Sequence, residues 1–325
     1  MKCPALKDLP PPPRGKGGWP WTEETTRIPD ETSKGQSWPK ISVITPSYNQ
    51  GEFLEETIRS VLLQGYPDLE YIIIDGASTD HSVEIIKRYE PWLTYWESEP
   101  DRGQSHAINK GFRRARGEIL AWINSDDPYV PGAFRRVSEL VHSFCCQDVE
   151  WEGWLIGRCL IWNLIDGERR NLNPELPPED PVQLLKLRCP QRSSFWSRSC
   201  WERVGPLSED LHFAFDTEFF LRLVFSGYQP ILLPEVLALG RVHPECKTSR
   251  QRKSWGPEML VVYDRLADFL QPAERLRVRR AVRADLARVR YRESRKCNRW
   301  LATIAAGSKI LWYSPPWSRQ EGLPF

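Results

Sequence analysis

The chain has 325 residues, with Lys+Arg 45 and Asp+Glu 43, which give a formal net charge of +2. This length suits one large domain or two small ones, and the balanced charge offers no overall positive excess for nucleic acid. Charged residues make up 27% of the chain and aromatic residues 11%, which excludes a wholly disordered chain and a membrane-embedded one. We therefore expect a globular protein with no nucleic-acid partner.

The eight cysteines form no CxxC pair, and we identify no metal-ligand spacing between them and the five histidines. Most are expected to be buried free thiols. Prolines occupy the N-terminal stretch where a signal peptide has its apolar core, and no segment reaches the roughly 18 apolar residues of a membrane span. These features predict a cytoplasmic location, where disulfides are rare.

Residues 1–39 contain prolines throughout, and proline interrupts both helices and strand ladders. We predict a proline-rich leader that is partly disordered. Its tryptophans, Trp19, Trp21 and Trp38, are unusual in a solvated segment and should pin the leader onto the surface of the domain.

From residue 40 the pattern alternates between strand and helix. A β-branched run at 41–45 precedes helical spacing at 52–64, and an apolar run at 71–74 precedes an amphipathic stretch at 82–89. The pattern continues with a strand at 93–96, a helix at 105–116 and a strand at 119–123. This alternation predicts an α/β fold with a parallel sheet.

The second half is less regular. We predict two strands within 151–165, a proline-rich crossing at 174–180, a helix at 213–225, a strand at 229–239 and helices after Pro257. Between Gln271 and Arg299 basic residues strongly outnumber acidic ones. The C-terminal part is therefore locally basic.

Polar residues follow three predicted strands, at 46–49, 75–78 and 124–127. Ligands of open α/β sheets bind at the carboxyl ends of strands, so these groups should converge on one crevice. The adjacent carboxylates of Asp126 and Asp127 repel each other unless a cation lies between them, and oxygen ligands suit Mg²⁺ or Mn²⁺ bridging nucleotide phosphates. The alternative is that one of the two caps the turn into Pro128.

Three further features are candidates for chemistry. Asp216 lies among phenylalanines near the start of a predicted helix, where it suits either a general base of raised pKa or an N-cap. His243 suits a metal ligand, a phosphate contact or a structural histidine. The turn at 101–105 opens a helix and offers backbone N–H groups and Arg102 to an anion.

Three segments in this order resemble the signatures of glycosyltransferase family 2: ISVITPSYNQ at 41–50, IIDGASTD at 73–80 and GEILAWINSDD at 117–127. The stretch 99–111 further resembles an uncharacterised bacterial branch. The resemblance implies a GT-A fold, an α/β fold in which helices flank a parallel or mixed nucleotide-binding sheet. It further implies a catalytic domain at 40–248, with a nucleotide-binding half at 40–145 and an acceptor half at 146–248. A basic helical extension at 249–325 follows.

The resemblance also assigns roles to residues. It places a donor-nucleotide site at Thr45, Pro46, Tyr48, Asn49, Asp75, Ser78, Arg102, Gln104, Asn124 and Ser125. The family's DxD position is occupied by residues 124–126, where Asn124 replaces the first Asp, so Asp126 becomes the principal metal ligand. His243 matches a late histidine that approaches the metal, and Asp216 matches the catalytic base.

By this resemblance the protein is a metal-dependent, inverting glycosyltransferase that uses Mn²⁺ or Mg²⁺. Its donor would be a nucleotide-diphosphate sugar, with UDP favoured, and its acceptor a glycan or a lipid-linked molecule of cell-surface polysaccharide biosynthesis. One alternative is a sugar-1-phosphate nucleotidylyltransferase, but 46–50 lacks the glycine-rich basic loop that such an enzyme needs. Another is a non-catalytic carbohydrate-binding protein, against which the presence of both Asp126 and Asp216 counts.

Trp196 and Trp201 are expected either to stack on sugar faces or to pack in the core.

The basic C-terminal tail also has two interpretations. Its arginines at spacings of four, four and seven would share one helical face beside an apolar stripe, namely Arg275, Arg279, Arg283 and Arg290 beside Leu276, Val282, Leu286 and Val289. With the apolar segment 300–312, this face either holds the enzyme peripherally at the inner face of the plasma membrane or packs on the domain.

Overall fold

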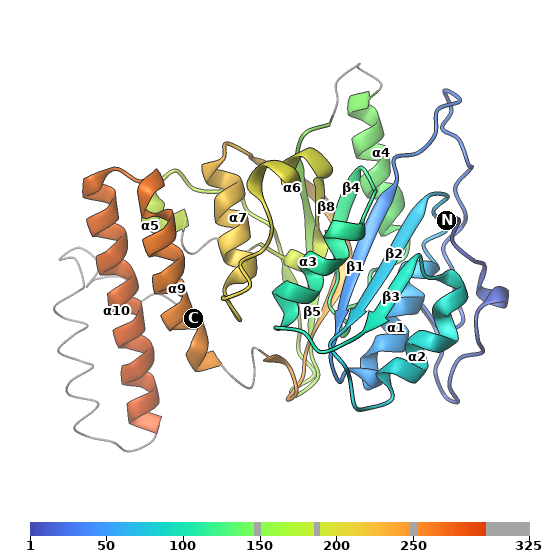
Figure 1. Ribbon diagram of the computed structural model, residues 1–325, viewed down its shortest axis with the longest axis horizontal. Helices are drawn as coiled ribbons and strands as arrows, with labels where there is room; N and C mark the ends of the chain where they lie inside the picture. Colours follow the sequence, from blue (N-terminus) through green and yellow to red (C-terminus); the bar gives the residue numbers. More distant parts are fainter. Residues whose placement is uncertain (146–150, 185–188, 248–251, 297–325) are drawn as a thin grey trace. The chain divides into compact units, whose positions relative to one another are not determined.

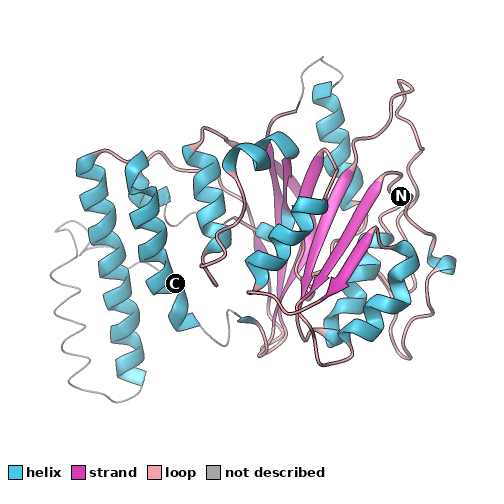
Figure 2. Ribbon diagram, viewed as in Figure 1, coloured by secondary structure: helices cyan, strands magenta, loops and turns pink. Residues whose placement is uncertain are grey.

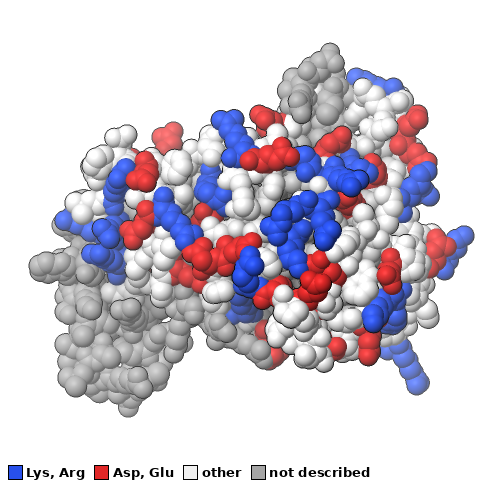
Figure 3. All heavy atoms as spheres, in the orientation of Figure 1, with Lys and Arg blue, Asp and Glu red and all other residues white. Residues whose placement is uncertain are grey.

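The computed structural model describes residues 1–145, 151–184, 189–247 and 252–296 (Figure 1). The chain divides into two compact units. The first comprises Met1–Pro177 and Arg188–Ser249, and the second comprises Pro178–Leu187 and Arg250–Phe325. On the face drawn in Figure 3, Lys and Arg side chains are interspersed with Asp and Glu side chains, in keeping with the small net charge.

The first unit is built on one mixed sheet, in which the strand order begins β3-β2-β1-β4-β7-β5-β6. The four strands of its parallel part are β1 (Ile41–Ser47), β2 (Leu69–Asp75), β3 (Tyr95–Ser98) and β4 (Ile119–Trp122). Its antiparallel part continues through β7 (Ser194–Ser197), β5 (Trp154–Asn163) and β6 (Arg169–Leu172). The parallel sheet predicted from the alternation is thus confirmed for β1 to β4.

Strand β8 (Pro230–Val242) runs parallel to β5 and brings a distant part of the chain to the end of β4. The N–H of Leu239 donates to the carbonyl of Pro128 at 2.9 Å. Two residues further on, the N–H of Arg241 donates to the Asp127 carboxylate at 3.1 Å. The residues that follow β8 therefore lie beside the polar loop that follows β4.

Helices cover both faces of the sheet, as a parallel sheet requires (Figure 2). One face is covered by α1 (Gly51–Leu62), α2 (Ser82–Tyr89) and α4 (Ala133–Cys145) in one buried apolar cluster. The other carries α3 (Gln104–Arg114), α6 (Arg198–Val204) and α7 (Phe215–Phe225). In α3, Gly111 lies so close to β1 that a Cβ there would be 2.4 Å from Ile44 Cγ2.

An aromatic cluster fills the second face. Trp196 is fully buried, and its ring centroid lies 4.9 Å from that of Trp122 and 5.3 Å from that of Phe219. Core packing is therefore the role of Trp196, and the sugar-stacking alternative is wrong for it. Trp201 is half-buried and packs against Phe112 at 4.4 Å.

The leader contacts the domain through a buried arginine of α1. Arg59 is fully buried and donates to three leader carbonyls, those of Pro10 at 2.8 Å, Pro20 at 3.0 Å and Trp21 at 3.0 Å. Outside a short 3₁₀ turn at Leu6–Asp8 and one isolated bridge, the leader has no helix or strand among its described residues 1–39. Backbone carbonyls that a ladder would otherwise use are thus free to bind Arg59.

Trp21 is buried, and Trp19 donates from Nε1 to the carbonyl of Tyr129 at 2.8 Å. The tryptophans therefore pack onto the domain as the sequence predicted.

Two other predictions were wrong in detail. The segment 151–165 holds one strand, because the chain reverses only at Gly167, whose positive φ of 79° suits the turn before β6. A helix, α9 (Arg252–Leu266), begins before Pro257 and continues through it.

The second unit contains α5 (Pro181–Leu184), α9, a 3₁₀ turn at Ala267–Phe269 and α10 (Pro272–Lys296). Arginines of α10 form ion pairs within this unit: Arg275 with Asp268 at 3.5 Å, Arg277 with Asp180 at 2.7 Å and Arg279 with Asp264 at 3.7 Å.

The predicted apolar stripe of α10 is wrong at Leu276, which is 53% exposed, and confirmed at Val282, which is buried on the same face as Val278. Leu286 is half-buried. The side chains of Val289 and Arg290, and the whole segment 300–312, lie outside the described residues. None of the helices in the described part of the chain is long and apolar enough to span a membrane.

Candidate functional site

The loops after β1 and β2 are tied together by hydrogen bonds. The N–H of Asn49 donates to Ser78 Oγ at 2.8 Å, and Asn49 Oδ1 accepts the N–H of Thr79 at 2.8 Å. Asn49 has a positive φ of 51°, which asparagine tolerates better than most residues. These contacts hold the two loops as one rigid edge at the carboxyl ends of the strands.

Asp75 ends β2 as a buried carboxylate that accepts several hydrogen bonds. Ser78 donates to it from N–H at 2.8 Å and from Oγ at 2.6 Å, and Ser98 donates from Oγ at 2.7 Å. Such donors fix the orientation of the carboxylate. Residues predicted near the nucleoside differ in exposure, since Tyr48 is 62% exposed whereas Thr45 is buried and its hydroxyl bonds to Tyr71 Oη at 3.0 Å. Pro46 is also buried.

The start of α3 contributes the next side of the site. Gln104 donates from Nε2 to Asn124 Oδ1 at 2.7 Å, and Lys247 donates from Nζ to Gln104 Oε1 at 3.4 Å. The loop before α3 also lies close to Gly76 after β2, because a Cβ at Gly76 would be 2.9 Å from Asp101 Oδ2. Arg102 is exposed and forms an ion pair with Glu209, so the structure does not join it to the other predicted donor residues.

The two carboxylates after β4 have different surroundings. Asp127 is buried and accepts from Arg192 Nε at 2.8 Å, from the Arg241 N–H at 3.1 Å and from Asn124 Nδ2 at 3.3 Å. Burial raises the pKa of Asp127, and the guanidinium of Arg192 opposes that rise. Neither side chain caps the turn into Pro128, since Asp127 is used by these three donors and Asp126 points elsewhere.

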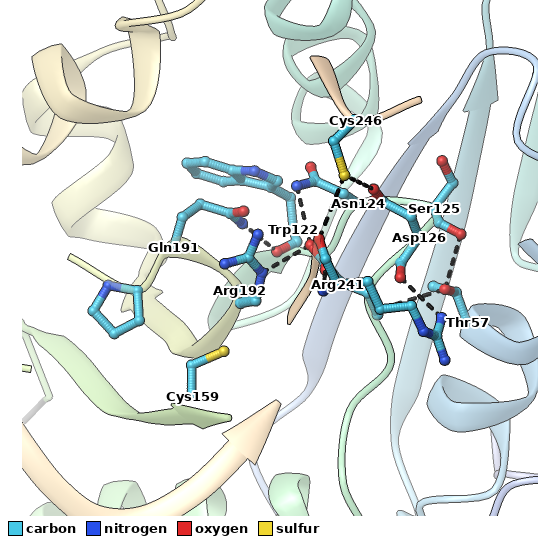
Figure 4. Close-up of polar contacts among 12 residues, drawn as sticks. Thr57, Trp122, Asn124, Ser125, Asp126, Cys159, Gln191, Arg192, Arg241 and Cys246 are labelled. Carbon is cyan, nitrogen blue, oxygen red and sulfur yellow. Dashed lines mark hydrogen bonds and ion pairs between the residues drawn. The ribbon is translucent and has the colours of Figure 1, made fainter. Parts of the chain in front are cut away.

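Asp126 is directed to a histidine and a cysteine that follow β8. Its Oδ2 lies 3.1 Å from His243 Nε2 and 3.9 Å from Cys246 Sγ, and the three ligand atoms lie within 4.8 Å of one another. Figure 4 shows the thiol of Cys246 turned toward the Asp126 carboxylate. The prediction that no cysteine has a metal-ligand spacing with a histidine was therefore wrong, because His243 and Cys246 are three residues apart in one tight turn.

The buried Arg241 holds the backbone of the loop that carries Asp126. Arg241 donates from Nη1 to the carbonyl of Asp126 at 2.9 Å and forms an ion pair with Glu56 of α1. The ring of Phe53 packs against His243 with centroids 4.4 Å apart. Ser125 is fixed through its carbonyl, which accepts from the Thr57 hydroxyl at 3.0 Å. The backbone of the loop is thus held while the Asp126 side chain remains partly exposed.

Asp216 lies in the first turn of α7. The N-cap of this helix is Ala214, so the N-cap alternative for Asp216 is wrong; its Oδ1 accepts the N–H of Thr217 at 2.6 Å instead. Burial raises the pKa of Asp216, while Thr217 and the charges of Arg192 and Lys247 oppose the rise. Because Arg192 also bonds Asp127 and Lys247 bonds Gln104, Asp216 shares its electrostatic surroundings with the donor loops.

Sequence reasoning missed Arg192, Arg241 and Cys246. No local pattern marks the two arginines, because each acts through contacts more than sixty residues away in the chain. Cys246 carried a readable signal, since a histidine and a cysteine three residues apart are a known ligand spacing.

A divalent cation fits the residues present. The oxygen of Asp126, the nitrogen of His243 and the sulfur of Cys246 converge on one point, and such side chains are the usual protein ligands of divalent metals. Asp127 adds no ligand atom, because its oxygens are used by Arg192, Arg241 and Asn124.

Comparison with known proteins identifies the family and agrees with this fold. Residues 42–145 match the family described as Glycosyl transferase family 2. An uncharacterised glycosyltransferase of Mycobacterium tuberculosis is 32% identical over 192 residues, which cover 57% of this chain and 69% of that protein. The Bacillus subtilis glycosyltransferase TuaG, named for teichuronic acid biosynthesis, is 36% identical over 33% of this chain and 44% of its own.

Solved structures share the fold. The S. aureus TarS fragment 1–349 in complex with UDP-GlcNAc superposes with a TM-score of 0.58 at 16% identity, covering 85% of this chain and 82% of that one. The mannosyltransferase PcManGT of Pyrobaculum calidifontis, in complex with GDP-Man and Mn²⁺, has a TM-score of 0.55 at 19% identity, with 93% and 81% covered. At this identity the likeness concerns the GT-A fold alone.

Proposed function

Since the chain belongs to glycosyltransferase family 2, we propose that it is an inverting enzyme that transfers a sugar from a UDP-sugar to a hydroxyl group of a glycan or lipid-linked acceptor. The observation that carries this proposal is the convergence of Asp126 and His243 beside the tied loops that follow β1 and β2. The Asp216 carboxylate belongs to the same electrostatic surroundings.

The nucleotide would lie along the edge formed by the loops after β1 and β2. Asp75 is oriented by Ser78 and Ser98 to face a base, and the exposed ring of Tyr48 offers a stacking surface. Ser125 and Asn124 would border the ribose and Gln104 the diphosphate. We propose that Arg102 contacts the donor only once it has left its ion pair with Glu209.

Asp126 and His243 would hold Mn²⁺ or Mg²⁺ in this site. When bound, the cation stabilises the negative charge of the departing diphosphate. The role of the chain is to keep the Asp126 backbone fixed through Arg241 and to keep Asp127 out of the ligand set through Arg192. Lys247, at 3.4 Å from Gln104, adds a positive charge on the same side.

Asp216 would act as the general base. Its Oδ1 is held by the amide of Thr217, so Oδ2 would accept the proton of the acceptor hydroxyl as that oxygen attacks the anomeric carbon. A raised pKa suits this role because a stronger base takes the proton more readily. A single displacement of this kind inverts the anomeric centre.

Three of the similar proteins support parts of this proposal. TarS is described with UDP-GlcNAc and PcManGT with GDP-Man and Mn²⁺, which supports a nucleotide-sugar donor and a divalent cation. TuaG is named for teichuronic acid biosynthesis, which supports an acceptor in cell-surface polysaccharide biosynthesis. A cytoplasmic location and peripheral attachment to the membrane remain proposals, and the ion pairs of α10 favour packing as the role of its arginines.

The test is a screen of UDP-, GDP- and dTDP-sugars for slow hydrolysis of the donor in the presence of Mn²⁺. We expect release of UDP from a UDP-sugar, and loss of that release on addition of a chelator. Binding of sugar nucleotides without metal dependence or turnover would instead favour a carbohydrate-binding protein.

A further inference from the structure

The proposed metal site contains a third side chain whose chemistry differs from that of Asp126 and His243. Cys246 Sγ lies 3.9 Å from Asp126 Oδ2. It accepts the backbone N–H of His243 at 3.2 Å, and it lies 3.4 Å from the carbonyl of Arg241. The turn that carries His243 therefore also directs the sulfur at the point where the carboxylate and the imidazole meet.

We propose that Cys246 is a direct ligand of the divalent cation, so that the protein binds it through oxygen, nitrogen and sulfur. This inference rests on the metal site of the proposed function and specifies its donor set. The thiol proton passes to solvent as the sulfur–metal bond forms. The remaining coordination positions are left for oxygens of the donor diphosphate.

The distances agree with this ligand set. Bonds of about 2.0 Å to oxygen and nitrogen and about 2.3 Å to sulfur place tetrahedral ligand atoms about 3.3 to 3.6 Å apart. The observed separations are 3.1 Å from oxygen to nitrogen and 3.9 Å from oxygen to sulfur, and none of the three exceeds 4.8 Å. Small side-chain rotations therefore suffice to close the triangle around an ion.

The fold supplies what such a site needs from its surroundings. Phe53 packs on the His243 ring, and Arg241 and Glu56 pair beneath the turn. These contacts hold the imidazole and the backbone in place before a metal arrives. Asp127 cannot replace the sulfur as a ligand, because its oxygens are used by Arg192, Arg241 and Asn124.

A sulfur ligand changes which metals the site prefers. Mg²⁺ favours oxygen ligands and water, whereas thiolates favour Zn²⁺ and other first-row transition ions. We therefore expect the apo protein to bind Co²⁺ and Zn²⁺ more tightly than Mg²⁺, with Mn²⁺ between them. His243 already favours transition ions, and Cys246 should add to this preference. Cys246→Ser should lose the added part, since serine keeps the small polar side chain without the sulfur.

The experiment is a titration of the full-length, metal-stripped protein with Co²⁺, under a reductant that contains no thiol. A near-ultraviolet thiolate-to-cobalt charge-transfer band is expected in the wild type, and it should be absent from Cys246→Ser. The matched control is Cys3→Ser, a free buried cysteine of the leader that should leave the band unchanged. Circular dichroism and thermal melting of each variant establish that it is folded.

Competition titrations give a second readout. Loss of a direct ligand should cost at least as much as loss of an outer-shell partner, so Cys246→Ser should weaken Co²⁺ and Zn²⁺ binding roughly 10- to 100-fold or more. Mg²⁺ binding should change by less than about threefold, because Mg²⁺ gains little from sulfur.

The outcomes separate this inference from the proposed function. Co²⁺ binding without a charge-transfer band, or equal metal selectivity in the wild type and Cys246→Ser, overturns the sulfur ligand even if sugar transfer is found. A band that depends on Cys246 in a protein without transferase activity supports the ligand set and contradicts the proposed reaction instead. Absence of metal binding in the presence and absence of UDP overturns both.

Discussion

Asp126 and Asp127 are adjacent in the chain but take different partners. The Asp127 carboxylate is 1% exposed and bonded to the guanidinium of Arg192, whereas that of Asp126 is 19% exposed and meets a histidine. A sequence pattern treats the pair as equivalent. Their surroundings separate a structural carboxylate from a candidate ligand.

This difference predicts opposite phenotypes for the two positions. Asp126→Ala should abolish metal-dependent binding of UDP with little change in stability. Asp127→Ala should instead lower the free energy of unfolding, by up to roughly 3 to 5 kcal/mol, because it leaves the mostly buried Arg192 guanidinium and the buried N–H of Arg241 without their acceptor. Calorimetric titration with UDP and Mn²⁺, together with urea unfolding of both variants, measures the two effects. Undiminished metal-dependent affinity in Asp126→Ala would remove this residue from the site.

Asp216 predicts a change in rate and in its pH dependence. Asp216→Asn should lower turnover roughly 10²- to 10⁴-fold while donor binding stays nearly intact. Since burial raises the pKa of this carboxyl, the acidic limb of the wild-type kcat profile should lie at higher pH than for an ordinary aspartate. Turnover that survives within a few-fold would assign the base to another group.

The same shift has a consequence for stability. A carboxyl whose pKa is raised in the folded state favours folding when protonated, and this contribution is lost as the pH rises through the raised pKa. When it is ionised, Asp216 therefore opposes folding, so Asp216→Asn should be at least as stable as the wild type. Thermal melting at neutral pH is the companion measurement to the kinetics.

At the scale of elements, α3 is held unusually close to β1. A methyl group on Gly111 would lie 2.4 Å from Ile44 Cγ2, inside any allowed contact. Gly111→Ala should therefore cost roughly 1 to 3 kcal/mol through overpacking, which exceeds the approximately 1 kcal/mol gained in helix propensity. Urea unfolding is the measurement, and Gly17→Ala, with open space around it, is the matched control. A stabilised Gly111→Ala would show that α3 can move away from the sheet.

Elements with local signals could be predicted from the sequence. The alternation of 40–123 identified β1, β2, α2 and β4 to within a few residues, because buried parallel strands are apolar runs and surface helices are amphipathic. The convergence of the three polar loops followed from the same topology. The single long strand β5 could not be predicted, since its length depends on pairing with β8, which lies nearly eighty residues further along the chain.

The site was predictable only in part for a related reason. Asp126, His243 and Asp216 were identified by resemblance, and the structure brings Asp126 and His243 together. Arg192 and Arg241 act through pairing that exists only once the sheet has formed. In the sequence these two residues are indistinguishable from surface arginines. In the structure Arg241 is buried and Arg192 is mostly buried.

At the scale of the whole molecule, the arginines of α10 test the membrane hypothesis. Arg277 and Arg279 are ion-paired within the second unit, so we expect α10 to add little attraction to anionic lipid. Pelleting of the full-length protein with anionic vesicles should match that of a variant carrying Arg279→Gln and Arg283→Gln. Neutral vesicles are the control. Salt-sensitive pelleting that falls in the variant would establish α10 as a membrane contact.

The contacts of Arg59 also determine how the molecule would respond to a break in its chain. The carbonyls that this buried guanidinium binds come from both sides of the exposed stretch that contains Arg14 and Lys16. A protease that cleaved after either residue would leave Pro10 on one fragment and Pro20 and Trp21 on the other. Both fragments would remain bound to the same side chain. Cleavage of the leader would therefore leave the two fragments associated, and they would separate only when the protein is denatured.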